Sequence, residues 1–108
     1  MSEGRQLTLE ILSGPLDGAT ITLEAEMEWS RAGQGYLTFP WDTELGEPQA
    51  RFTVEGKSRW YLEGLDAPHG TYRVNREERL GGDRKKAQLE GGDILKASNT
   101  WLLVRRVE

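Results

Sequence analysis

The chain is dominated by short segments in which apolar and polar residues alternate, and turn-forming residues separate these segments. Leu7, Leu9 and Ile11 alternate with Thr8 and Glu10, which is the period-two pattern of a strand with one buried face. No segment carries the sustained i, i+3, i+4 apolar stripe of a helix, and the best helical candidate, residues 75–80, is too short. The predicted strands span residues 7–12, 19–23, 27–30, 37–39, 51–55, 59–62, 71–74, 86–89, 93–96 and 100–107. Many short strands with frequent turns predict an all-β fold, either a β-sandwich or a small barrel.

The length of the chain limits its organisation. It has 108 residues, which suits one compact domain with one hydrophobic core. We expect a single domain over residues 1–108, with a flexible N-terminal tail at residues 1–6. There is no cysteine, which excludes disulfides and cysteine-ligated metals. No apolar run approaches the roughly 18 residues of a membrane span, and the polar N-terminus lacks the apolar core of a signal peptide. We expect a cytoplasmic protein that is not inserted in a membrane.

Charge and residue types narrow the function classes. The net charge is −4, which argues against nucleic acid and anionic membranes as the main partners. His69 is the only histidine, and the sequence holds neither a Gly-x-Ser-x-Gly nucleophile elbow nor an Asp-x-Asp-x-Asp-Gly calcium loop. We therefore expect no enzyme, no bound cofactor and no metal site.

Two stretches in the second half of the chain carry the most specific pattern. Residues 66–75 read Asp-Ala-Pro-His-Gly-Thr-Tyr-Arg-Val-Asn, and residues 89–94 read Leu-Glu-Gly-Gly-Asp-Ile. A loop that ends in Gly70-Thr71 thus enters a strand, and a later turn containing Gly92 and Asp93 precedes another. This order resembles the forkhead-associated (FHA) domain, whose usual text is Asp-x-x-Ser-x-Asn-Gly-Thr, then Val-Asn, then Leu-x-x-Gly-Asp-x-Ile. Arg73 is one extra residue before the Val-Asn pair.

The resemblance covers nearly the whole chain. Residues 7–23 fit the strand, Gly-Pro turn and strand with which FHA domains open, and residues 42–50 fit the family's Asp-x-x-Val-Ser-Arg-x-His-Ala run. The resemblance implies an FHA/SMAD-like β-sandwich of about ten to eleven mostly antiparallel strands in two sheets. It also implies a protein-interaction module, because FHA domains read phosphothreonine peptides through a few loop residues.

Those loop residues are largely changed here. In the family, the Arg of a Gly-Arg pair and the Ser of a Ser-Arg pair bind phosphate oxygens. By that analogy Arg31 is retained, Gly46 has lost the hydroxyl, and Glu47 replaces the second arginine. Phosphate is recognised by charge-assisted hydrogen bonds, and Glu47 places a carboxylate near a group that carries a charge of about −2. The sequence therefore predicts a scaffold whose phosphate site is degenerate.

The remaining loop positions follow the same comparison. Ser30 stands for the Gly of Gly-Arg, Ala67 for the Ser before Gly-Thr, and His69 for the Asn that holds the peptide backbone. Gln49 replaces a structural histidine, and we expect it to keep the bracing role because an amide both donates and accepts hydrogen bonds. The candidate peptide- or phosphate-binding residues are Ser30, Arg31, Gly46, Glu47, Gln49, His69, Gly70 and Thr71.

Three functions fit these residues. The favoured one is a phosphorylation-independent binding or scaffold domain for a protein or peptide partner. Degenerate FHA domains resemble the cytoplasmic modules of bacterial secretion machines and of kinase-linked signalling proteins, so a larger multidomain protein or assembly is an expected setting. The second is a phosphothreonine reader that uses Ser30, Arg31, Thr71 and backbone amides. The third is a small-ligand-binding β-sandwich in which Trp29 or Trp41 stacks on a sugar-like ring.

Overall fold

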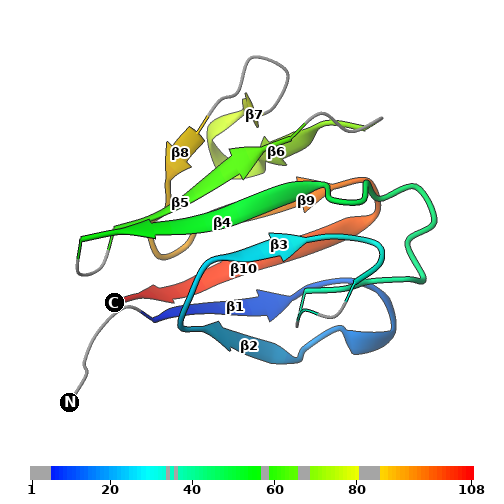
Figure 1. The fold of residues 1–108 in the computed structure, drawn as a ribbon, viewed down its shortest axis with the longest axis horizontal. Coiled ribbons are helices and arrows are strands. Elements are labelled where there is room, and N and C mark those ends of the chain that lie inside the picture. The colour runs from blue at the N-terminus through cyan, green and yellow to red at the C-terminus, as the bar shows by residue number, and fades with distance from the viewer. Residues whose placement is uncertain (1–5, 34, 36, 57–58, 66–68, 81–85) are drawn as a thin grey trace.

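A computed structural model describes residues 6–33, 35, 37–56, 59–65, 69–80 and 86–108 (Figure 1). The predicted tail over residues 1–5 and the substitution at Ala67 lie outside the described residues. Gln6, which we expected to belong to the tail, is instead held by two backbone hydrogen bonds with Glu108, of 2.9 and 2.8 Å. In the described part of the chain, no helix has the length and apolar character needed to cross a bilayer.

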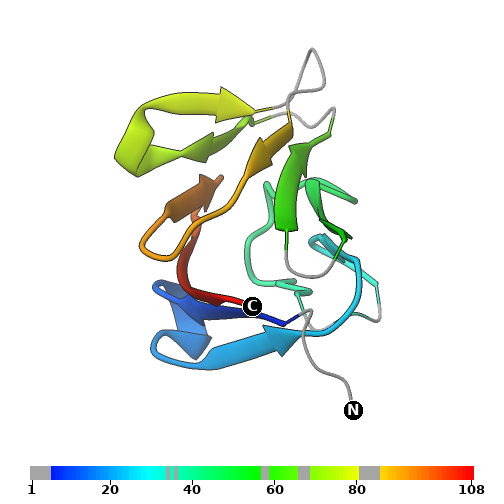
Figure 2. The ribbon, with the colours of Figure 1, turned by 90° about the vertical axis from the view of Figure 1, so that its left-hand side faces the viewer.

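The described residues form ten strands in two antiparallel sheets, which confirms the predicted all-β sandwich (Figure 2). The six-stranded sheet has the order β2 (Thr20–Leu23), β1 (Leu7–Ile11), β10 (Thr100–Val107), β9 (Ile94–Ala97), β6 (Thr71–Arg73) and β7 (Glu78–Leu80). The four-stranded sheet has the order β3 (Met27–Trp29), β4 (Ala50–Glu55), β5 (Arg59–Gly64) and β8 (Lys86–Gln88). Figure 2 shows the sheets as two layers that face each other.

One predicted strand is absent from the described part of the structure, and one strand of the structure was not predicted. Residues 37–39 form no strand of their own, because only Thr38 makes a bridge, to Ser30. Residues 75–80, which we judged too short for a helix, contain β7 instead, a strand that we did not predict. A short 3-10 turn, Val74–Arg76, is closed by Glu77 in the left-handed region at φ 54°, and β7 then pairs back onto β6. A three-residue strand shows too little alternation to be recognised without its partner.

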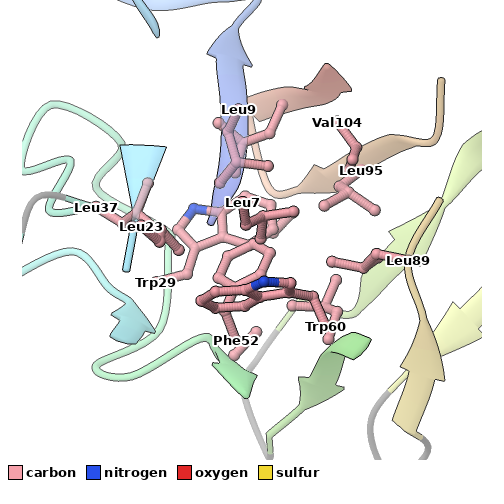
Figure 3. Packing of buried hydrophobic residues seen from close by; sticks show 14 of the residues in the cluster. Leu7, Leu9, Leu23, Trp29, Leu37, Phe52, Trp60, Leu89, Leu95 and Val104 are labelled. Carbon is pink, nitrogen blue, oxygen red and sulfur yellow. The ribbon is translucent and has the colours of Figure 1, made fainter. Parts of the chain in front are cut away.

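The core lies between the sheets and is rich in large side chains (Figure 3). Alternate residues of β1 are fully buried, as the period-two pattern predicts. Trp29 and Phe52 stack with ring centroids 6.1 Å apart. Because Trp29 is fully buried, it cannot stack on a ligand, and that part of the small-ligand interpretation is wrong. Trp41 is 39% exposed and packs edge-on against Phe39.

Two buried carboxylates join segments that are distant in sequence. Asp42 accepts hydrogen bonds from the Ser98 hydroxyl (2.8 Å), the Asn99 amide (3.0 Å) and the Thr100 hydroxyl (2.6 Å). This contact fixes the segment before β4 to the turn between β9 and β10. Asp93 is more than the turn residue that we expected, because its Oδ2 lies 3.0 Å from Nη1 of Arg73 and its Oδ1 accepts from Asn75.

Both carboxylates have pKa values below their ordinary range. Burial works against ionisation of Asp42, but the hydroxyls of Thr100 and Ser98 and the amides of Asn99 and Glu44 outweigh it and lower its pKa. Burial likewise opposes ionisation of Asp93, and the hydrogen bonds from Asn75, the Glu90 amide and Arg73, with the charge of Arg73, lower the pKa of Asp93. Each carboxylate therefore binds its proton more weakly in the folded state than in the unfolded state.

This difference predicts acid sensitivity. The stabilisation from the two carboxylates should be complete above the unfolded-state aspartate pKa of about 3.9 and should be lost as pH falls below it. Urea unfolding between pH 3 and pH 7 measures the effect. Asp42→Asn should flatten the pH dependence, whereas Asp17→Asn, a change at an exposed aspartate, should leave it unchanged. A free energy of unfolding that is constant across this range would contradict the assignment.

Candidate functional site

The candidate site lies at the end of the sandwich opposite the chain termini (Figure 1). It is made by the segment between β3 and β4, residues 30–49, and by the residues just before β6. We call the described part of these segments the loop cluster. Arg31 follows β3 and its amide donates to the Gly46 carbonyl at 3.0 Å. The segment is thus folded back on itself, so that residues 15 apart in sequence meet.

Gln49 fixes the loop cluster from the inside. Its side chain is fully buried, and its Oε1 accepts from the Gly46 amide at 2.8 Å. Its Nε2 donates to the His69 carbonyl at 2.7 Å and to the Thr71 hydroxyl oxygen at 2.9 Å. One amide therefore connects the segment before β4 to the segment before β6. This is the bracing role that we expected of Gln49.

Arg31 and Glu47 form an ion pair across the loop cluster, between Nη2 and Oε2. Both side chains stay about two-fifths exposed, at 41% and 42%. We expected Glu47 to lie near an incoming phosphate and repel it. The structure places the carboxylate on the guanidinium itself, so the one retained phosphate-type cation is already neutralised by its own chain.

The hydrogen-bonding groups of Ser30, Gly46 and Thr71 are engaged within the protein. The Ser30 hydroxyl is buried; it donates to the Ala32 carbonyl at 2.7 Å and accepts from the Ala32 amide at 3.2 Å. The Thr71 hydroxyl is buried against Gln49. The Gly46 amide is used by the same glutamine. The Ser30 hydroxyl and the Gly46 amide thus donate within the protein, and all three groups belong to buried residues.

His69 lies at the rim of the loop cluster and is half exposed. Its Nε2 is 2.8 Å from Oε1 of Glu44, a contact that the sequence did not indicate. The two residues separate two shallow depressions. The first, which we call the Arg31 depression, has a volume of about 360 Å³. It is lined by Arg31, Thr43, Glu44, Leu45, Gly46, Glu47 and His69.

The sequence-predicted residues therefore divide into three groups. Four of them surround the Arg31 depression: Arg31, Gly46, Glu47 and His69. Three others, Ser30, Gln49 and Thr71, are buried side chains that hold the loop cluster together. Gly70 instead lines the neighbouring depression. The described residues contain no group of three or more His, Cys, Asp or Glu side chains placed to hold a metal ion.

Sequence comparison gives no relative, because no family model matches the chain and no curated protein matches it significantly. Solved structures do resemble it. The FHA domain of a hypothetical protein from Arabidopsis thaliana superposes with a TM-score of 0.81 at 20% identity, over 97% of this chain and 88% of that one. The FhaA FHA domain, solved in complex with the intracellular domain of Rv3910, gives a TM-score of 0.74 at 23% identity, over 92% and 99%.

Two further FHA structures agree. One comes from work on phosphothreonine-dependent FHA domain interactions, with a TM-score of 0.74, 23% identity and coverage of 93% and 95%. The other is the FHA domain of CT664 from Chlamydia trachomatis, with a TM-score of 0.74, 16% identity and coverage of 93% and 96%. The chain therefore has the FHA fold, as the order of its motifs predicted.

Proposed function

We propose that this FHA-fold domain is a protein-interaction module that binds its partner without needing a phosphothreonine. The observation that carries the proposal is the Arg31–Glu47 ion pair. A phosphate that approached Arg31 would meet the Glu47 carboxylate, which already pairs with the guanidinium. The two negative charges would then lie close together and repel each other. Charge-assisted contacts to phosphate need donors that face outward, whereas the Ser30 hydroxyl and the Gly46 amide donate to groups of the protein itself.

The structural neighbours support a protein partner. One FHA structure of the same fold is a complex with the intracellular domain of another protein, and another belongs to a study of phosphothreonine-dependent interactions. Other proteins with this fold therefore use it in interactions with partners. The loop cluster of this domain offers a polar rim around the Arg31 depression, and we propose it as a contact surface within a larger assembly.

Phosphopeptide titration tests the proposal. A phosphothreonine peptide library and its unphosphorylated counterpart should bind with affinities that differ by less than tenfold, which is about 1.4 kcal/mol. Fluorescence anisotropy of labelled library members measures both. A phosphate-dependent gain of tenfold or more that disappears in Arg31→Ala would establish a phosphothreonine reader instead.

If the lost Ser-Arg pair explains the absence of a phosphate preference, restoring that pair should create one. Gly46→Ser with Glu47→Arg restores the hydroxyl and the cation of the family's Ser-Arg pair and releases Arg31. We expect this double variant to prefer phosphorylated peptides by about tenfold, because charge-assisted hydrogen bonds are each worth roughly 1.5–3 kcal/mol. Glu26→Arg makes the same charge change at an exposed position of the β2–β3 connection. An equal gain in Glu26→Arg would show that net charge alone is responsible.

A further inference from the structure

A row of alternating cations and aromatic rings crosses the outer face of the six-stranded sheet. Tyr72 on β6 lies directly opposite Arg79 on β7 and opposite Lys96 on β9, and Lys96 in turn lies opposite Trp101 on β10. The Arg79 guanidinium is 6.0 Å and the Lys96 ammonium 5.9 Å from the Tyr72 ring centroid, and the Lys96 ammonium is 5.8 Å from the Trp101 ring. We call these four side chains the Tyr72 row.

The two cations of the row have no carboxylate partner among the described residues. Every other lysine and arginine in that part of the chain forms an ion pair, with the single exception of Arg59. The domain carries a net charge of −4, so carboxylates are in excess. Two unpaired cations on the same aromatic ring are therefore a local departure from the charge pattern of the surface.

The row opens into a second depression next to the loop cluster. It has a volume of about 430 Å³, and Tyr72, Arg79 and Lys96 form one side of it while Ser98 and Asn99 add polar groups. Gly70 also lines this depression, and its lack of a side chain leaves room for Arg79 and Tyr72. A Cβ there would lie 2.7 Å from Nε of Arg79 and 3.1 Å from the Tyr72 hydroxyl, so a larger residue would push these two side chains away from their present positions. The one carboxylate on the rim, Glu44, is engaged by His69.

We propose that the Tyr72 row binds an acidic segment of a protein partner. Arg79 and Lys96 would each hold an Asp or Glu side chain, and the rings of Tyr72 and Trp101 would pack against the intervening chain. This inference rests on the proposed function, because it gives the chemistry of the partner.

The spacing of the cations favours two carboxylates over one phosphate. β7 and β9 lie on either side of β6, and neighbouring strands are about 4.8 Å apart, so the two backbones are separated by roughly 10 Å. A phosphate is bound by donors that converge on one point. Cations that flank a ring from opposite sides match successive acidic side chains of an extended peptide.

A labelled peptide tests the inference. The probe is a fluorescein-labelled 12-residue peptide of Glu and Asp spaced by Gly, and it is compared with its Gln and Asn counterpart and with a peptide that carries one phosphoserine. We expect the acidic probe to shift the amide NMR signals of Tyr72, Arg79 and Lys96. Arg79→Gln with Lys96→Gln should weaken its binding at least tenfold, and Lys96→Arg should retain it.

Arg59→Gln is the matched control, because Arg59, at the start of β5 in the other sheet, is the remaining cation among the described residues that forms no ion pair. It should change the affinity by less than twofold. The inference is overturned if Arg59→Gln weakens binding as much as the double variant, or if the Gln and Asn peptide binds equally well. It is also overturned if the phosphoserine peptide alone binds at the row, or if the row mediates association of two copies of the domain.

Failure of this inference is distinguishable from failure of the proposed function. If the acidic probe does not bind and phosphothreonine peptides still show no preference, only the role of the Tyr72 row is wrong. If phosphothreonine binding depends on Arg31 while the acidic probe still requires Arg79 and Lys96, only the independence from phosphorylation is wrong.

Discussion

Arg73→Met is expected to lower the free energy of unfolding by about 3–5 kcal/mol, because it removes the closer of two cations from the buried Asp93 carboxylate. The side chains of Arg73 and Asp93 are only 7% and 2% exposed. The guanidinium donates to Asp93 at 3.0 Å, to the Gln88 carbonyl at 2.8 Å and to Glu78 at 2.8 Å. One side chain thus joins β6 to β7 and to the segment between β8 and β9. Methionine fills a similar volume but can form none of these hydrogen bonds.

Arg105→Met is the control for that change. The Arg105 side chain is 55% exposed and lies 2.8 Å from Glu10, and surface ion pairs of this kind contribute about 0–1 kcal/mol. Urea unfolding monitored by tryptophan fluorescence measures both variants. Equal losses in the two variants would show that the Arg73–Asp93 pair does not have the weight that its burial indicates.

Asp42→Ala is expected to cost on the order of 3 kcal/mol, since it removes the acceptor shared by two hydroxyls and a backbone amide, of which the Thr100 hydroxyl is buried. The largest local effect should fall on the Asn99 amide, which donates to Asp42 and should exchange its hydrogen faster. Asp17→Ala provides the comparison, because Asp17 is exposed and such substitutions usually stay within about 0.5 kcal/mol. A loss for Asp42→Ala that is no larger would contradict the role of Asp42 as the anchor of the loop cluster.

The parts of the fold that the sequence predicted are those governed by local pattern. The strands predicted over residues 51–55 and 59–62 are β4 and β5, which pair as a hairpin with Glu55 opposite Arg59, although residues 57–58 lie outside the described part. β7 was not predictable in the same way, because three residues carry no readable period and the strand depends on pairing with β6. The Tyr72 row likewise needed the strand order, since β6, β9 and β10 are neighbours in space and not in sequence.

The candidate site also combines contacts that the sequence predicted with contacts that it did not. Comparison with FHA motifs predicted that Gln49 would brace the loops, because that role depends on the chemistry of one side chain. It did not predict that Glu47 would pair with Arg31 or that Glu44 would contact His69, because each pair depends on how the segment from 30 to 49 folds back. Asp93 looked like a turn residue because its partner Arg73 is 20 positions away and belongs to another strand.

The backbone pairing of Gln6 with Glu108 has a practical consequence for binding measurements. An affinity tag at either end would leave the domain from the side away from the loop cluster. A bead or sensor chip that captures the protein by such a tag would therefore present residues 30–49 and the Tyr72 row to the solution. Bait immobilised in this orientation suits the search for its partner.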